Sequence, residues 1–328
     1  MSTTDLTRRA WLRRSSQATL AALASPSLTQ LTRAAPAPAS ETLVTQLYGS
    51  LDETQRSALC LPWDHELRLK VDNNWHITPT PINKILQPDQ VDLVRQIFDG
   101  LHSDEYKKEV WRQFDQDNKR DGGFGSASIA LFGQPGSGQF EFVLTGRHCT
   151  RRCDGDSEAG TAFGGPIFYG HAAQSFNETA QHPGNAYWYQ AQRANELFQA
   201  LDGKQRQQAL QDGKSPAERG NRTVALSGKT RGLVGLPVSA MSPDQKALFL
   251  QVLGDLLKPF RESDQAEAMR YLQAAGIDDL HISYYPFDDI GEDGVWDVWQ
   301  IEGPHMVWYF RGAPHVHCWA HIKAPTSA

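Results

Sequence analysis

The sequence lacks the patterns that mark several large classes of protein. No stretch of the 328 residues approaches the about 18 consecutive apolar positions of a membrane-spanning helix, so we expect no membrane span in the mature chain. No basic run occurs after residue 33, and the formal net charge is −6. A polyanion needs a basic surface to bind, so we expect no nucleic-acid partner.

Short catalytic motifs are also missing. The chain has no G-x-S-x-G, which excludes the simplest serine hydrolase, and no C-x-x-C, which excludes a thioredoxin-like redox motif. His65-Glu66 lacks the second histidine of a zincin, and Leu226–Thr230 lacks the first glycine of a phosphate-binding loop. Any chemistry must therefore come from residues that are distant in the sequence.

The first residues do carry a twin-arginine pattern. Thr7-Arg8-Arg9-Ala10-Trp11-Leu12 precedes a weakly apolar stretch, and small-residue cleavage sites surround Ala37. The weakly apolar stretch contains serine and threonine, which makes it a poor signal for the Sec route, whereas the paired arginines suit the Tat route. We expect residues 1–39 to be a signal peptide that the Tat export machinery reads. The mature protein is then periplasmic or secreted.

Four cysteines remain to be explained: Cys60, Cys149, Cys153 and Cys318. An oxidising compartment permits one or two disulfides among them. Four cysteines allow three pairings, and the sequence leaves the choice open.

Helical landmarks recur in the same order along the chain. Leu47–Arg56 and Leu197–Arg206 share apolar positions followed by an aspartate that can cap a second helix. Gln87–Gln90 and Ser242–Gln245 each place a proline at the start of an apolar helical run, where the first turn tolerates it.

Strand-like sequence follows the helices in both halves. Residues 128–132 and 140–148 form one predicted hairpin, and residues 281–285 and 297–305 form the other. Gly146-x-His148 then matches Gly303-x-His305. We predict an α+β fold of two pseudo-equivalent halves, 43–150 and 193–322, each a helical pair followed by an antiparallel hairpin. The halves pack as one domain over 43–322.

The densest histidine cluster is Pro314-His315-Val316-His317 near the C-terminus. On a strand, His315 and His317 project from the same face, so two imidazoles could bind one metal ion with a third ligand from elsewhere. We predict His148 as that third ligand, with His305 in reserve at the matched position. Packed, hydrogen-bonded core histidines are the alternative.

A long segment over 154–185 links the halves. Loops of this length are usually functional or disordered, and its aromatic residues argue against disorder. We predict a lid-like loop that covers the metal site and brings His171 near it, as fourth ligand or proton donor, with Tyr169 as a second catalytic candidate. A surface loop that packs its own aromatic residues is the alternative.

Three neutral imidazoles suit copper, iron or zinc equally. We predict an exported metal-dependent enzyme acting on a small molecule, and favour an oxidoreductase because Tat cargo is often redox-active and aromatic residues surround the candidate ligands. A metal-dependent hydrolase is the close alternative. A non-catalytic periplasmic binding or structural protein is the third reading.

The same landmarks resemble a known family. The Phe132–Gly136 turn, the Gly-x-His strand end at His148, the pair His315 and His317, and the two Leu-Asp-x-x-Gln-Arg helices are similar to the bacterial family called domain of unknown function 3500 (DUF3500). The family commonly has Gly-His-His at the first site and Asn-His-x-His-x-x-Trp at the last. Arg147, Pro314 and the position of Trp319 depart from it, which is typical of a divergent branch. The resemblance implies shared histidines and no known activity.

Overall fold

The computed structural model describes residues 39–172, 182–212, 215–285, 295 and 298–325. The predicted signal peptide and the middle of the predicted lid therefore lie outside the described residues. Residues from Pro38 onward group as one compact unit.

Capping residues explain where several helices begin. Asp52 caps α2 and Asp202 caps α7 through reciprocal capping boxes with the glutamine three residues later. Proline occupies the first position of α4 and of α8, where its missing N–H costs nothing. The α-helices are α1 (Ser40–Ser50), α2 (Glu53–Leu59), α3 (Ile82–Ile85), α4 (Pro88–Gly100), α5 (Lys107–Asn118), α6 (Trp188–Ala200), α7 (Gly203–Ala209), α8 (Pro243–Leu257) and α9 (Glu262–Ala275).

Ten strands form one sheet in the described part of the chain, in the order β1-β2-β3-β4-β5-β10-β9-β8-β7-β6. Every neighbouring pair is antiparallel except β1 with β2. The strands are β1 (Cys60–Leu61), β2 (Ser128–Gly133), β3 (Phe140–Gly146), β4 (Cys149–Cys153), β5 (Ile167–His171), β6 (Leu236–Pro237), β7 (His281–Tyr285), β8 (Val298–Gly303), β9 (Met306–Arg311) and β10 (Val316–Ile322).

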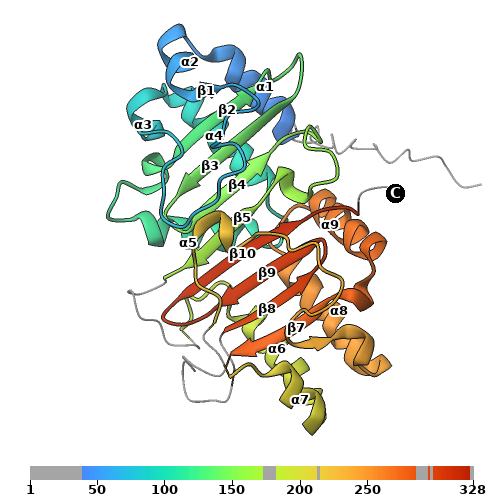
Figure 1. Ribbon diagram of the computed structural model, residues 1–328. Coiled ribbons are helices and arrows are strands. Elements are labelled where there is room, and N and C mark those ends of the chain that lie inside the picture. Colours follow the sequence, from blue (N-terminus) through green and yellow to red (C-terminus); the bar gives the residue numbers. More distant parts are fainter. Residues whose placement is uncertain (1–38, 173–181, 213–214, 286–294, 296–297, 326–328) are drawn as a thin grey trace, which may run out of the picture. The chain divides into compact units, whose positions relative to one another are not determined.

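The two faces of the sheet have different coverings. The helices pack against one face and lie behind the sheet in Figure 1. Irregular segments cross the other face, which we call the loop face, and they bury aromatic residues such as Phe168 and Trp319. Side chains alternate between the faces along each strand, so Val316 and Cys318 point to the helices while Trp319 points to the loop face.

A buried ion pair anchors one of these irregular segments. Arg152 on β4 contacts Glu141 on β3 at 2.6 Å, and Arg68 from the segment before α3 contacts the same carboxylate at 3.0 Å. Arg152 also donates to the carbonyl oxygens of Lys70 and Pro166. The loop face is thus covered on the side of the first half by backbone that β4 holds in place.

The strand order reads as a mirror image about the β5–β10 pair, with β1 to β5 on one side and β6 to β10 on the other. Matching polar contacts accompany it. Gln55 and Gln90 exchange reciprocal amide hydrogen bonds of 2.7 and 3.0 Å. Gln205 and Gln245 exchange the same pair at 2.9 and 2.8 Å. Each pair joins the second helix of its half to the proline-initiated helix.

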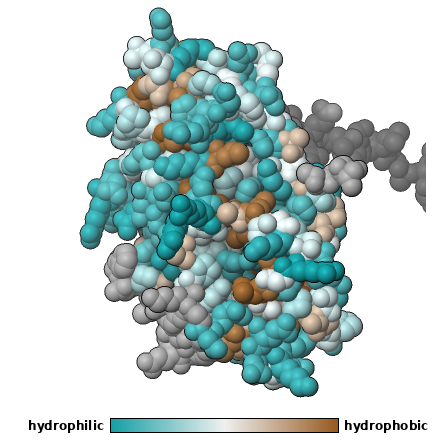
Figure 2. All heavy atoms as spheres, viewed as in Figure 1, coloured by the Kyte–Doolittle hydropathy of each residue, from teal (hydrophilic) through white to brown (hydrophobic). Residues whose placement is uncertain are grey.

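The mixed α+β class and the antiparallel hairpins β2–β3 and β7–β8 agree with the prediction, although residues 286–294 and 296–297 before β8 lie outside the described part. The prediction of one hairpin per half gave too few strands, because the sheet also contains β4, β5, β9 and β10. Among the described residues, no helix has the length and apolar character that a bilayer span requires. The molecular face in Figure 2 is mainly hydrophilic, with hydrophobic groups in small separate patches.

The predicted linking loop over 154–185 needs correction. Residues Ile167–His171 form β5, which pairs with both β4 and β10 in the middle of the sheet. Gly164, Gly165 and Pro166, which suggested a loop, precede this strand, and Gly170 lies within it. Residues 173–181 of the predicted lid lie outside the described residues.

Candidate metal centre

Strand alternation places two histidines on the loop face at one end of β10. Val316 and Cys318 are buried among the helices, so the residues on either side of Val316, His315 and His317, point the other way. Their Nε2 atoms lie 3.0 Å apart. The prediction that they project together is confirmed.

His148 reaches the same place from the turn between β3 and β4. Its backbone has φ of +54°, in the left-handed region that residues other than glycine rarely adopt. Asn74 holds this backbone, because its Oδ1 accepts a hydrogen bond of 3.1 Å from the His148 N–H. The turn therefore aims the imidazole across β5 toward β10.

Gly170 on β5 makes room for the imidazoles. It pairs with His317 across the β5–β10 ladder. A Cβ at this position would lie 3.2 Å from Cδ2 of His148 and 3.3 Å from Cδ2 of His317, closer than most real contacts. The ring of Phe168, two residues earlier on the same face, packs edge-on against His317 at 5.1 Å between centroids. Glycine and phenylalanine thus form the floor of the site.

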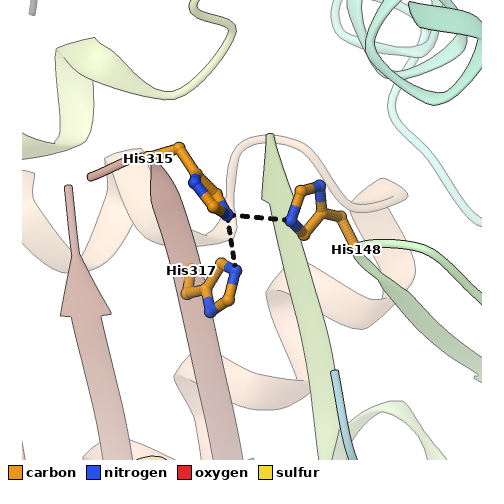
Figure 3. A group of neighbouring side chains, drawn as sticks. All are labelled: His148, His315 and His317. Carbon is orange, nitrogen blue, oxygen red and sulfur yellow. Dashed lines mark hydrogen bonds between the residues drawn. The ribbon is translucent and has the colours of Figure 1, made fainter. Parts of the chain in front are cut away.

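The three imidazoles converge on one point, as Figure 3 shows. The Nε2 atoms of His148 and His315 lie 3.1 Å apart, and one ligand atom from each residue falls within 4.8 Å of the others. All three side chains are buried, with exposures of 1 to 4%. Nitrogen ligands about 2.0–2.1 Å from one ion at a tetrahedral angle lie roughly 3.3 Å apart. The group could therefore hold a metal ion.

Two carboxylates, the buried Asp117 and the half-buried Glu218, orient two of the rings from behind. Nδ1 of His148 lies 3.0 Å from Oδ2 of Asp117 on α5, and Nδ1 of His317 lies 2.7 Å from Oε2 of Glu218. Each Nδ1–H donates to its carboxylate, which leaves the Nε2 lone pair free for a metal. Such carboxylate–histidine pairs usually support metal ligands and fix their tautomer.

Electrostatics agree with a neutral His317 imidazole and with an ionised Asp117 carboxylate. Burial lowers the pKa of His317 well below its usual value, and the nearby Arg311 lowers it further. Burial raises the pKa of Asp117, but hydrogen bonds from His148 and His171 outweigh it and hold the net pKa well below the ordinary value. A neutral imidazole is the form that binds metal.

Hydrogen bonds among the three rings cannot give every Nε2 atom a suitable partner. Because His148 and His317 donate from Nδ1, their Nε2 atoms are acceptors. Nε2 of His315 faces both of them, at 3.1 and 3.0 Å, and carries one hydrogen at most. One of the two contacts would then join two lone pairs, whereas a shared cation satisfies all three.

His171 lies close to this group but does not join it. Its Nδ1 is 3.4 Å from Oδ2 of Asp117, the same oxygen that contacts His148. Tyr169 lies one residue before Gly170 and points to the helices, where its hydroxyl donates to Gln190 at 2.9 Å. The proximity predicted for His171 holds, whereas Tyr169 faces away from the imidazoles.

His305 occupies the turn between β8 and β9, at the other end of β10. Its carbonyl oxygen accepts from Lys323, just after β10 ends, while His315 and His317 lie where that strand begins. Seven strand residues span roughly 20 Å. The reserve ligand His305 is therefore far from the other histidines, because the β8–β9 turn and the start of β10 lie at opposite ends of antiparallel strands.

The cysteines are not ligands here. All four are free thiols, and Cys149, Cys153 and Cys318 are buried. Cys149 and Cys318 pack in the clusters under the helices, on the face opposite the imidazoles, as strand alternation predicts.

Sequence reasoning missed both carboxylates. Asp117 shares a helix face with the buried Val110 and Phe114 at helical spacing, and an acid on an apolar face is a usable signal. Glu218 lies in an irregular segment before η3 (Gly220–Arg222), where no periodicity distinguishes it from other acids.

Comparison with known proteins adds a family. The family described as protein of unknown function (DUF3500) matches residues 33–323. No curated protein and no solved structure matches the chain.

Proposed function

Since the chain belongs to the DUF3500 family, whose function is unknown, we propose from the site itself that the protein is a metal-dependent enzyme with a mononuclear centre. His148, His315 and His317 hold one transition metal ion through Nε2. The observation that carries the proposal is the convergence of three buried acceptor nitrogens, at 3.0 and 3.1 Å, with carboxylates behind two of them.

Three protein ligands leave at least one coordination position for water, dioxygen or a small-molecule substrate. We favour an oxidoreductase with copper or iron. Aromatic side chains back the ligands, because Phe168 contacts His317 at 5.1 Å and Trp319 at 4.6 Å between ring centroids. Such a surround excludes water from a reactive metal centre.

A metal-dependent hydrolase is the second candidate, and the ligand set itself favours it. Three histidines also bind zinc in enzymes that lower the pKa of a metal-bound water. The acids Asp117 and Glu218 behind the ligands would help neutralise a divalent ion in either chemistry. The third reading, packed histidines without metal, leaves two Nε2 lone pairs facing each other.

The leader supports a periplasmic or secreted location. Arg8 and Arg9 fit the Tat route, which exports folded proteins, often with a cofactor already inserted. We infer that the metal is loaded before export.

We also infer that the two halves arose by internal duplication. The mirrored strand order and the matched glutamine pairs Gln55–Gln90 and Gln205–Gln245 support this. In that reading His148 and His305 are equivalent turn residues, of which one lies in the site.

The test is elemental analysis of protein purified after its own export, with its absorption and electron paramagnetic resonance spectra. We expect about one equivalent of a transition metal and a melting temperature that falls with chelator. Copper or iron with a reversible redox signal supports the oxidoreductase, and zinc alone supports the hydrolase. A folded protein with less than about a tenth of an equivalent and a chelator-insensitive melt would contradict both.

A further inference from the structure

Asp117 is held by more contacts than its role behind His148 requires. Its Oδ1 accepts from the backbone N–H of Ala172 at 3.0 Å. Its Oδ2 faces Gln113 at 3.0 Å, His148 at 3.0 Å and His171 at 3.4 Å. The side chain is fully buried. Four donors from three segments of the chain therefore meet at one carboxylate.

The position of Asp117 makes these donors necessary. It lies in the last turn of α5, next to Asn118, and that turn contains no basic residue. The unpaired carbonyl groups at a helix C-terminus carry partial negative charge, which disfavours a carboxylate. A buried anion there needs donors that are themselves fixed in place.

His171 is such a donor, and its geometry excludes a role as ligand. Its Nε2 lies 2.6 Å from the carbonyl oxygen of Gly184, and its Nδ1 faces Asp117. Both nitrogens face oxygen atoms that accept hydrogen bonds, so neither presents a lone pair to a metal.

We propose that His171 is a positioning residue of the metal centre: it clamps Asp117 between Gly184 and His148, so that Asp117 fixes the tautomer and ring orientation of His148. The proposal rests on the metal centre proposed above. It replaces the predicted role of His171 as fourth ligand or proton donor.

The second carboxylate is arranged in the same way. Glu218 contacts His317 through Oε2 at 2.7 Å and Arg311 through Oε1 at 3.3 Å. In both cases a ligand imidazole contacts a carboxylate, and the carboxylate contacts a second nitrogen-bearing side chain, His171 or Arg311. The same order in two arms built from different segments supports a shared purpose.

Two variants of His171 separate its two hydrogen bonds. The amide nitrogen of asparagine matches Nδ1 of histidine, so His171→Asn keeps a donor for Asp117 and loses the contact with Gly184. The amide nitrogen of glutamine matches Nε2, so His171→Gln keeps the contact with Gly184 and loses the donor for Asp117. The pair is therefore matched in polarity and differs in which partner is kept.

Metal affinity is the first readout, by titration of the purified apo protein with Co²⁺ followed by its visible spectrum, and by competition with Zn²⁺. We expect His171→Gln to weaken binding about 10-fold or more, and His171→Asn to stay within about 3-fold of wild type. The Co²⁺ spectrum should keep its shape in both. Equal losses in both variants with an altered spectrum would make His171 a ligand and overturn the proposal, as would unchanged affinity in both.

The tautomer of His148 is the second readout, and it needs no metal. Long-range ¹H–¹⁵N spectra of the apo protein should show Nδ1–H for His148 in wild type and His171→Asn, and a tautomer mixture in His171→Gln. A wild type that binds no metal but shows this pattern contradicts the proposed function and upholds the positioning role. An unchanged His148 tautomer in a folded His171→Gln overturns the positioning role alone.

Discussion

Nε2 of His148 and Nε2 of His315 lie 3.1 Å apart although 167 positions separate the two residues. His148 comes from the β3–β4 turn of the first half and His315 from the start of the last strand. Their meeting depends on β5, which inserts between β4 and β10 and carries Gly170 beneath His148 and His317. The site is thus built where the two halves of the sheet join.

The two matched turns offer a controlled test of the ligands. His148→Asn tolerates the left-handed backbone but is too short to place a nitrogen at the site. We expect metal affinity to fall at least about 100-fold, since one of three ligands is lost. His305→Asn, in the β8–β9 turn, should bind metal like wild type. Equal effects of the two substitutions in a metal titration would refute the assignment.

Removing charge from the supporting carboxylates should weaken metal binding without removing a ligand. In Asp117→Asn and Glu218→Gln the amide presents a donor as well as an acceptor, so the Nδ1–H tautomer of the imidazole is no longer enforced. We expect affinity to fall about 10- to 100-fold in each. Asp115→Asn, exposed on the same helix as Asp117, is the control. If Asp117→Asn and Asp115→Asn bind Zn²⁺ equally well, the carboxylate plays no part.

Gly170→Ala should damage both stability and the site. The added Cβ would lie 2.4 Å from the carbonyl oxygen of Val316, a backbone atom of the paired strand. We expect a loss of about 1–3 kcal/mol in the free energy of unfolding, together with weaker metal binding. Gly254→Ala, inside α8 with nothing within 4 Å, should instead stabilise by about 0.5–1 kcal/mol. Urea unfolding of both variants checks the contrast.

Two histidines away from the ligands, the buried His102 and the half-buried His321, predict acid sensitivity. Burial lowers the pKa of His102 well below its usual value and that of His321 to about 4. In the unfolded chain both histidines bind a proton near pH 6.5, whereas in the folded protein they stay neutral to a lower pH. The free energy of unfolding therefore decreases as the pH falls below about 6.5. Each histidine lowers the free energy of unfolding by up to ~1.4 kcal/mol per pH unit in this range. Asp264, whose pKa burial raises to about 6, offsets part of the loss below that pH.

The measurement is chemical unfolding of the apo protein at several pH values between 7.5 and 5. His102→Gln can still accept from Arg151, which contacts His102 at 3.1 Å, but it cannot titrate. We expect the stability of this variant to fall less steeply with acid than that of wild type. Parallel curves for the two proteins would show that His102 does not contribute.

The leader predicts dependence on the Tat route. Lysine in place of both Arg8 and Arg9 should leave the protein in the cytoplasm, because Tat reads the paired arginines. The same exchange at Arg13 and Arg14, in the same leader, should permit export. Cell fractionation with immunoblotting measures both, and export of the first variant would argue against this route.

The sequence alone predicted much of the local structure for physical reasons. The capping aspartates Asp52 and Asp202 and the prolines Pro88 and Pro243 mark helix starts because they satisfy or tolerate the unpaired N–H groups there. Alternation along β10 placed His315 and His317 on one face. Strand β5 escaped prediction because five residues between glycine-rich segments carry little periodic signal.

The sequence by itself determined which residues could act as ligands and which face of β10 carries two of them, because these properties depend on residue type and a two-residue period. Only the tertiary structure decided that His148 joins them, that His305 does not, and that Asp117 and Glu218 stand behind the rings. Those relations depend on strand order, on the direction of β5 against β10, and on where α5 and the segment before η3 lie across the sheet. Packing fixes such long-range geometry, and no local pattern encodes it.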